Sequence, residues 1–308
     1  MKFAFVFPGQ GSQAVGMMSA YADFAVVRET FDEASAALGF DLWAMVADGP
    51  AEVLAQTVNT QPIMLTAGVA VWRAWQSLDG PVPAVVAGHS LGEYAALVAA
   101  GAIDFKDAVG LVRFRAQAMQ EAVPAGEGGM AAILNLAPEE VAAACAEAAQ
   151  GQVVAAANLN SPVQIVIAGH AAAVERAMEA CKARGAKRAV PLPVSAPFHS
   201  ELMRPAAERL AARLAEVEFR SPAIPVLNNV DVAIESDPSR IRDALVRQAY
   251  GPVRWIETVQ AMHAQGVVRV AECGPGKVLA GLVKRIEASL EVDALIDAES
   301  VRRLREAL

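Results

Sequence analysis

Residues 82–101, VPAVVAGHSLGEYAALVAAG, give the clearest indication of the fold class. Residues 82–87 are a short apolar run of strand length, Gly88-His89-Ser90-Leu91-Gly92 is a glycine-rich turn, and residues 93–100 continue with a helical pattern. A strand that turns sharply into a helix is typical of an α/β architecture with buried parallel strands. The turn also fits G-x-S-x-G, in which small neighbours expose a serine hydroxyl at a helix N-terminus. We therefore expect Ser90 to be a nucleophile rather than part of an ordinary glycine turn.

The composition excludes several classes of protein. The chain has 308 residues, a formal net charge of −8, 55% hydrophobic residues and only 19% charged residues. It is too apolar and too weakly charged to be disordered, and too acidic overall for indiscriminate nucleic-acid binding. No apolar run approaches the ~20 residues of a membrane-spanning helix, and the apolar N-terminal run is too short for a signal peptide. Three cysteines without a CxxC pair make a disulfide or a thiolate metal site unexpected, so we expect a cytoplasmic protein.

The middle of the chain predicts a second, smaller unit. Its patterns run in the order β-α-β-β-α-β, which is typical of a ferredoxin-like, split-βαβ fold. We expect this small domain to span residues 125–195 and to be inserted into a larger α/β domain made of residues 1–124 and 196–308. The predicted elements of the small domain are strands at 130–134, 153–158, 163–168 and 187–192 and helices at 138–149 and 171–183. The large domain is expected to resume with a strand at 224–228, a helix at 241–248 and a strand at 267–271.

A serine nucleophile needs a base, and the chain has four histidines. His199 lies in a loop at the expected domain boundary, where a rigid scaffold can present a catalytic side chain, and we take it as the base. His89 inside the turn, His170 after a predicted strand and His263 in a helical run are expected to be structural or surface residues. No aspartate lies between Asp107 and His199, and the glutamates in this stretch fall mostly in the expected small domain, so we expect the usual acid of a hydrolase triad to be absent. An amide or a backbone carbonyl must then fix the imidazole.

With these motifs, the chain resembles the malonyl-CoA:acyl carrier protein transacylases, which are acyltransferases of bacterial type II fatty acid synthesis. The resemblance runs nearly end to end and in the right order. It implies an α/β-hydrolase-like large domain that carries the ferredoxin-like insertion. The matching segments are residues 5–13 (FVFPGQGSQ), 60–62 (TQP), 88–93 (GHSLGE), Arg115 with Met119 and Gln120, 160–162 (NSP), Phe198-His199 and 272–276 (ECGPG).

The resemblance assigns roles to matching positions. Ser90 would accept the acyl group, and His199 would be the base, held by the backbone carbonyl of Gln248. The backbone N–H groups of Gln10 and Leu91 would form the oxyanion hole. The resemblance further implies that Gln10, His89, Asn160 and Phe198 contact substrate, with Phe198 typical of members that take malonyl rather than bulkier methyl-branched units.

A guanidinium would select malonyl over acetyl. Arg115 would bind the free carboxylate of malonyl through a bidentate pair of hydrogen bonds, although Arg113 is a close competitor by sequence. The expected reaction is a ping-pong transfer from malonyl-CoA, through a malonyl-serine ester, to the phosphopantetheine thiol of acyl carrier protein. The alternatives are a serine esterase or thioesterase, which would need a triad acid and no carboxylate anchor, and a non-catalytic binding protein, which would not need both Ser90 and His199.

The expected partners follow from the same resemblance. No permanently bound cofactor is implied, since malonyl-CoA is a substrate and the carrier protein brings the phosphopantetheine. We expect a free-standing monomer, and the sequence does not distinguish fatty acid from polyketide supply. Carrier proteins are acidic, so an enzyme of net charge −8 needs a local basic patch to dock one. The candidate basic clusters are Lys182, Arg184, Lys187 and Arg188 in the small domain, and Lys284-Arg285 near the C-terminus.

Overall fold

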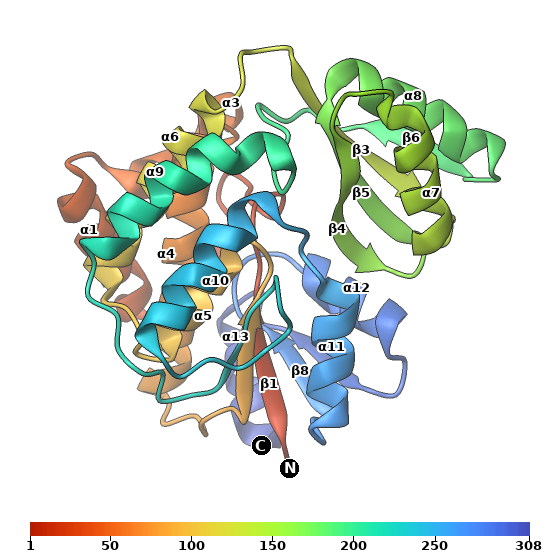
Figure 1. Ribbon diagram of the computed structural model, residues 1–308. Coiled ribbons are helices and arrows are strands. Elements are labelled where there is room, and N and C mark those ends of the chain that lie inside the picture. Colours follow the sequence, from red (N-terminus) through yellow and green to blue (C-terminus); the bar gives the residue numbers. More distant parts are fainter.

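Two β-sheets organise the chain, a parallel sheet of five strands and an antiparallel sheet of four (Figure 1). The computed structural model describes residues 1–308. The strands are β1 (Phe3–Phe7), β2 (Val85–Gly88), β3 (Gly128–Leu134), β4 (Val154–Ser161), β5 (Gln164–His170), β6 (Arg188–Pro191), β7 (Val226–Leu227), β8 (Arg269–Glu272) and β9 (Glu291–Ala294). The α-helices are α1 (Ala25–Leu38), α2 (Leu42–Asp48), α3 (Ala51–Leu54), α4 (Thr57–Ser77), α5 (Gly92–Ala99), α6 (Phe105–Glu121), α7 (Pro138–Ala149), α8 (Ala171–Ala183), α9 (Arg204–Ala215), α10 (Pro238–Tyr250), α11 (Trp255–Ala264), α12 (Val278–Ile286) and α13 (Ala298–Ala307).

The parallel sheet has the strand order β7-β2-β1-β8-β9 and is covered by helices on both faces. All five residues of β1 are buried. Phe3, Phe5 and Phe7 pack in the large hydrophobic core that includes α4 and α5, whereas Ala4 and Val6 pack on the opposite side with residues of α11 and α12. Burial on both faces explains why β1 is apolar at every position instead of alternating.

The turn between β2 and α5 requires glycine at both ends. A Cβ on Gly88 would lie 1.8 Å from the carbonyl carbon of Gly92, and a Cβ on Gly92 would lie 2.0 Å from the carbonyl oxygen of Phe7. Both contacts are with backbone, which cannot move aside. The two glycines therefore let α5 start directly against the neighbouring strand β1, with Ser90 at the tip of the turn.

The antiparallel sheet has the strand order β4-β5-β3-β6, and its elements follow the chain as β-α-β-β-α-β, which is the order expected from the sequence. Helices α7 and α8 cover one face and enclose their own small core. Figure 1 shows the other face turned toward the parallel-sheet body. Met130 and Val166 lie on that face, and Phe198 from the main body packs against them.

Several predicted boundaries were wrong. The sequence pattern of residues 61–75 predicts a helix that opens with Pro62 near its N-terminus, but helix α4 begins at Thr57 and has Pro62 inside it. Seventeen of its 21 residues are buried, and this tertiary packing outweighs one lost backbone hydrogen bond. The strand expected at 224–228 is only the two residues of β7, and that at 82–87 begins at Val85. The edge strand β9 was missed, since the sequence EVDA alternates too briefly to give a signal.

None of the helices combines the length and the apolar character needed to cross a membrane. The three cysteines are free thiols, and all are buried.

Candidate active site

The nucleophile elbow lies where β2 ends. Ser90 has φ of +52°, a left-handed conformation that is uncommon outside glycine and is found at functional sites. Asn229, which follows the neighbouring strand β7, holds the elbow from the side. Its Oδ1 accepts the N–H of Ser90 at 2.7 Å, and its Nδ2 donates to the carbonyl of Gly88 at 2.6 Å. The parallel neighbouring strands β2 and β7 end at the same edge of the sheet, which is why Asn229, 139 positions from Ser90, reaches the turn.

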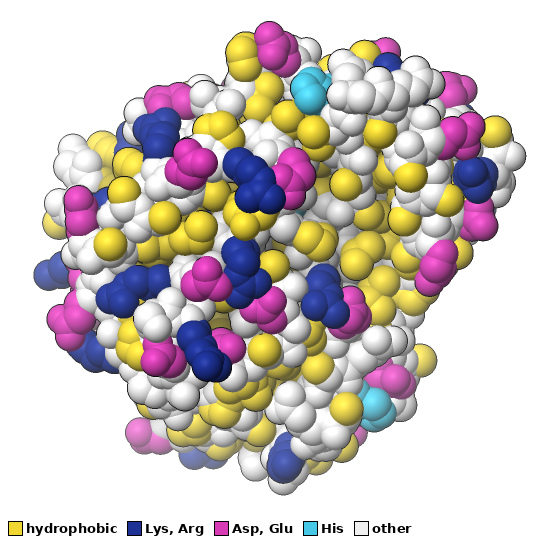
Figure 2. Space-filling view, viewed as in Figure 1, with side chains coloured by type: hydrophobic (Ala, Val, Ile, Leu, Met, Phe, Trp, Pro, Cys, Tyr) yellow, Lys and Arg dark blue, Asp and Glu magenta, His cyan; other side chains and the backbone are white.

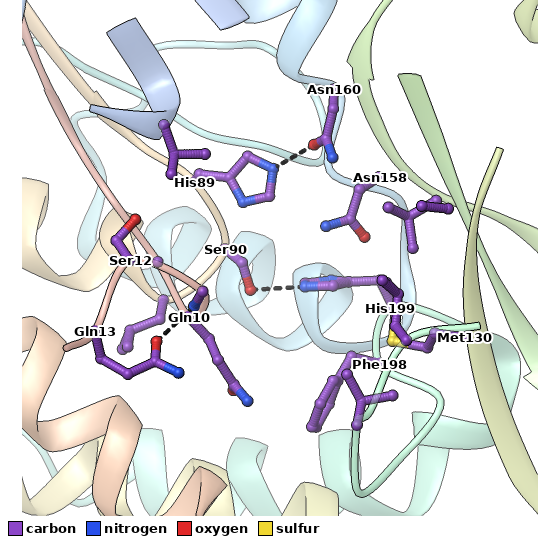
Figure 3. Close-up of a pocket in the computed structure, with 18 of the residues that line it drawn as sticks. Gln10, Ser12, Gln13, His89, Ser90, Met130, Asn158, Asn160, Phe198 and His199 are labelled. Carbon is purple, nitrogen blue, oxygen red and sulfur yellow. Dashed lines mark hydrogen bonds between the residues drawn. The ribbon is translucent and has the colours of Figure 1, made fainter. Parts of the chain in front are cut away.

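The structure brings His199 to Ser90 with its ring already oriented (Figure 3). His199 Nε2 lies 2.6 Å from Ser90 Oγ, while Nδ1 lies 2.8 Å from the carbonyl oxygen of Gln248 and 3.2 Å from that of Gly251. Carbonyl oxygens only accept, so Nδ1 carries the proton and Nε2 presents its lone pair to the serine hydroxyl. The backbone thus takes the place of the missing triad acid. His199 also has a positive φ of +57°.

Burial, followed by the positive charge of Arg115, lowers the pKa of His199 to about 3. The backbone carbonyls oppose this shift because the hydrogen bond that Nδ1–H donates to them is stronger when the ring is charged. The imidazole is therefore neutral over the whole range in which a base is needed.

Arg115 lies beneath the elbow and is 2% exposed. Its Nη2 donates to Ser90 Oγ at 3.2 Å and to Gln248 Oε1 at 3.0 Å, and its Nη1 donates to Gln61 Oε1 at 2.9 Å. No carboxylate lies within ion-pair distance of this guanidinium, and its Nε has no hydrogen-bond partner. Arg113 does not reach the site: its guanidinium stacks 4.6 Å from the centre of the Phe40 ring. Of the two arginines left open by the sequence, only Arg115 lies beside the nucleophile.

Glu93, the second residue of α5, is a buried carboxyl group that interacts electrostatically with Arg115. Its Oε2 accepts from Gln248 Nε2 and from the N–H of Asn229, both at 2.9 Å. Burial raises the pKa of Glu93 to about 7, against the lowering effects of these two hydrogen bonds and of Arg115.

The two residues expected to supply an oxyanion hole line the same cavity as Ser90. Leu91 lies between the nucleophile and the first turn of α5, where backbone N–H groups and the helix dipole favour a negative charge. Gln10 lies in the turn after β1, and its side chain reaches Thr57 Oγ1 at 3.4 Å. The backbone N–H groups of Gln10 and Leu91 donate to no acceptor in the protein, so both are available to an oxyanion.

A cavity of about 450 Å³ connects these groups, between the elbow and the open face of the antiparallel sheet. Figure 3 shows His89 bonded to Asn160, and Phe198 beside His199. The His89 Nε2–Asn160 Oδ1 distance is 2.8 Å, so this bond links the elbow to β4. Burial lowers the pKa of His89, which is therefore a neutral donor to Asn160. The cavity holds no group of three or more metal-ligating side chains.

Three residues of the site gave no separate signal in the sequence. Asn229 immediately follows a predicted parallel strand, and that position could have marked it. Asn158 lines the cavity with an Oδ1 that has no partner, but an asparagine inside a predicted strand does not reveal which way it faces. Glu93 belongs to the motif GHSLGE at residues 88–93, yet one of its contacts is with Gln248, 155 residues away.

Comparisons with known proteins give consistent matches over nearly the whole chain. Residues 4–304 match the family model described as acyl transferase domain. The chain is 60% identical over 295 residues to the malonyl CoA-acyl carrier protein transacylase of Salmonella typhimurium, covering 96% of each chain. It superposes on an acyl carrier protein S-malonyltransferase from Vibrio cholerae with a TM-score of 0.97 at 61% identity, covering 99% of this chain and 100% of that one. A malonyl-transacylase solved in complex with a type II PKS acyl-carrier protein gives a TM-score of 0.99 at 55% identity, with both chains covered completely.

Proposed function

The chain belongs to the acyl transferase family, among the malonyl-CoA:acyl carrier protein transacylases, and we propose that it moves a malonyl group from malonyl-CoA to the phosphopantetheine thiol of acyl carrier protein. The observation that carries the choice of malonyl is Arg115. The hydrogen-bond partners of this buried guanidinium, which lies 3.2 Å from the nucleophilic oxygen, are all neutral, and no carboxylate lies within ion-pair distance of it. Malonyl brings a carboxylate to that place, and acetyl does not.

The first half-reaction forms a malonyl-serine ester. Ser90 Oγ attacks the thioester carbonyl while His199 Nε2 takes its proton. The N–H groups of Gln10 and Leu91 stabilise the oxyanion of the tetrahedral intermediate. When the C–S bond breaks, the proton on His199 goes to the sulfur of CoA.

The second half-reaction reverses these steps with a new thiol. The phosphopantetheine thiol attacks the ester carbonyl and gives its proton to His199. The C–O bond to Ser90 then breaks, and His199 returns the proton to the serine oxygen. Atoms and protons balance over the cycle, and His199 ends neutral as it began.

Substrate binding also prepares the base. The charge of Arg115 contributes to the low pKa of His199, so a malonyl carboxylate that neutralises Arg115 raises the basicity of the imidazole. Acetyl leaves the charge in place, so the carboxylate that is recognised also helps to activate the serine.

The same proposal covers the finer architecture. We infer an α/β-hydrolase-like large domain, residues 1–124 and 196–308, with a ferredoxin-like domain inserted at 125–195. The strand order β4-β5-β3-β6 and the two helices on one face support this division. His89, Asn160 and Phe198 are proposed to shape the substrate cavity, with His89 acting through Asn160. The cytoplasmic location and the monomeric state remain predictions from the sequence.

The two basic clusters differ in their suitability for an acidic carrier. In the small-domain cluster, Arg184 is paired with Glu140 and Glu147 and Lys182 with Glu179, so two of its four cations are neutralised, while Lys187 and Arg188 form no ion pair. Arg285 has no carboxylate partner and reaches Gln164, a residue at the cavity, at 3.4 Å. Figure 2 shows charges of both signs interspersed over the face in view, without a large area of one sign. We propose that the carrier docks beside Arg285. Arg285→Ala is expected to raise KM for the carrier about threefold, with Arg184→Ala as the matched control, and an equal effect of the two would refute this docking site.

One experiment tests the central proposal. The protein is incubated with malonyl-CoA, its intact mass is measured, and holo acyl carrier protein is then added. We expect a malonyl adduct that is absent in Ser90→Ala and that moves to the carrier. Release of CoA with hydrolysis and no transferable adduct would instead support an esterase or thioesterase, a class disfavoured by the absence of a triad acid.

A further inference from the structure

Glu93 is a buried carboxylate close to the site that has no role in the reaction as described. It is 2% exposed and does not line the substrate cavity, so it cannot contact malonyl-CoA. Glu93 accepts two hydrogen bonds of 2.9 Å, from Gln248 Nε2 and from the N–H of Asn229. These two residues also hold His199 and Ser90, respectively.

The amide of Gln248 lies between Glu93 and Arg115. Its Nε2 donates to Glu93 Oε2 and, at 3.0 Å, to the carbonyl of Ser90. Its Oε1 accepts from Arg115 Nη2 at 3.0 Å. A rotation of the amide by 180° would place NH2 against the guanidinium and oxygen against both the carboxylate and the Ser90 carbonyl. All three contacts would become repulsive, so the orientation is fixed by chemistry.

This orientation matters because Arg115 Nη2 is shared between Gln248 Oε1 and Ser90 Oγ. The amide oxygen of Gln248 sets where the guanidinium lies relative to the nucleophile, and Gln61 fixes only the other nitrogen, Nη1. We propose that Glu93 is a positioning residue for malonyl selectivity: by binding the amide nitrogen of Gln248, it keeps the amide oxygen toward Arg115 and so fixes the guanidinium beside Ser90. This inference rests on the proposed function.

The measurement is the ratio of malonyl to acetyl adduct when the two CoA thioesters compete for one enzyme sample. This ratio is independent of the fraction of folded molecules, because both substrates compete for the same active sites. Glu93→Met removes both acceptor oxygens at nearly constant size, and we expect the ratio to fall about tenfold. Glu93→Gln keeps an oxygen that can accept the same two bonds, so it should retain the ratio to within about threefold.

A double substitution tests whether Glu93 acts through Gln248. Gln248→Met removes the amide but keeps the backbone carbonyl, and it should lower the ratio as much as Glu93→Met. The double variant should be no worse than Gln248→Met alone, because the amide that Glu93 orients is already absent. Should Glu93→Met not fold, an unchanged ratio in Gln248→Met still overturns the proposal.

The matched control is Glu272→Met. Glu272 is also fully buried and accepts the N–H of Ala280 at the start of α12, so its loss costs stability without touching the anchor, and its ratio should stay unchanged. An unchanged ratio in Glu93→Met, multiplying effects in the double variant, or an equal loss in Glu93→Gln would each overturn the proposal. These failures are distinct from a failure of the proposed function, in which the wild-type protein itself forms no malonyl adduct.

Discussion

The proposed base, His199, and the proposed carboxylate anchor, Arg115, lie within one hydrogen-bonded cluster, but they are held in different ways. His199 is oriented by two backbone carbonyls, those of Gln248 and Gly251. Arg115 is oriented by side chains, through hydrogen bonds to Gln61, Gln248 and Ser90 and by the Tyr94 ring, whose centre lies 5.5 Å from the guanidinium carbon. A backbone carbonyl persists whatever side chain its residue carries, whereas a side-chain acceptor does not. Substitutions around His199 should therefore leave it in place, while the anchor should respond at several positions.

The largest effect is expected where the base itself is removed. His199→Ala leaves Ser90 without a proton acceptor, and formation of the malonyl adduct should slow by about 10²–10⁴-fold. The measurement is the rate of adduct formation by rapid quench and mass spectrometry. His263→Ala, on the surface helix α11, is the control and should behave as wild type. A loss below about tenfold would mean that another group accepts the proton.

Removing the Arg115 guanidinium should change the preference for malonyl over acetyl more than the rate of acyl transfer. Arg115→Ala deletes the charge that meets the malonyl carboxylate, and the preference for malonyl over acetyl should fall about tenfold to a hundredfold. The ratio of the two kcat/KM values measures this directly. Arg113→Ala removes a guanidinium that stacks on Phe40 instead, and its ratio should be that of wild type. A fall in the Arg113 variant and none in the Arg115 variant would reverse the assignment made between them.

The sequence predicted the backbone-determined parts of this site better than the side-chain network. The run from residue 82 to 101 predicted the strand, the turn and the helix, since glycine spacing and apolar runs are local signals. The absence of an aspartate before His199 already required another group to orient the imidazole. The bonds of Glu93 and Asn229 were not predictable, because they join residues 136 and 139 positions apart whose side chains are common in other settings. Such contacts depend on which strands are neighbours in the sheet, and the strand predicted at 224–228, observed as β7, does not reveal that it lies beside β2.

The pH dependence of kcat/KM tests the low pKa assigned to His199. A base must be unprotonated, and the pKa of His199, lowered to about 3 by burial and by Arg115, keeps it so down to low pH. The kcat/KM for adduct formation should therefore stay level from pH 8 to pH 5, where a histidine with a pKa near 6.5 would already be mostly protonated. Protonation of Glu93 in this range leaves one carboxyl oxygen to accept both of its hydrogen bonds.

The Arg115→Ala variant supplies the internal control for this profile. With the positive charge gone, the pKa of His199 should rise, and the acid limb of kcat/KM should move to higher pH. A wild-type profile that falls with a midpoint near 6.5, or an acid limb that stays in place in the variant, would contradict the pKa assigned to His199.

The smallest effect is expected when the hydrogen-bond acceptor of Arg115 Nη1 is removed. Gln61 accepts only from Arg115 Nη1, the nitrogen that does not bond to Ser90. Gln61→Leu should therefore lower the preference for malonyl about threefold, less than Arg115→Ala and less than Gln248→Met, and it should leave the pH profile unchanged. If Gln61→Leu lowered the preference as much as Gln248→Met does, the two amides would be equivalent supports of the guanidinium. The position of Nη2 would then not depend specifically on the Gln248 amide that Glu93 binds. The contrast between His199, fixed by backbone carbonyls, and Arg115, fixed mainly by one oriented side chain, would then be wrong.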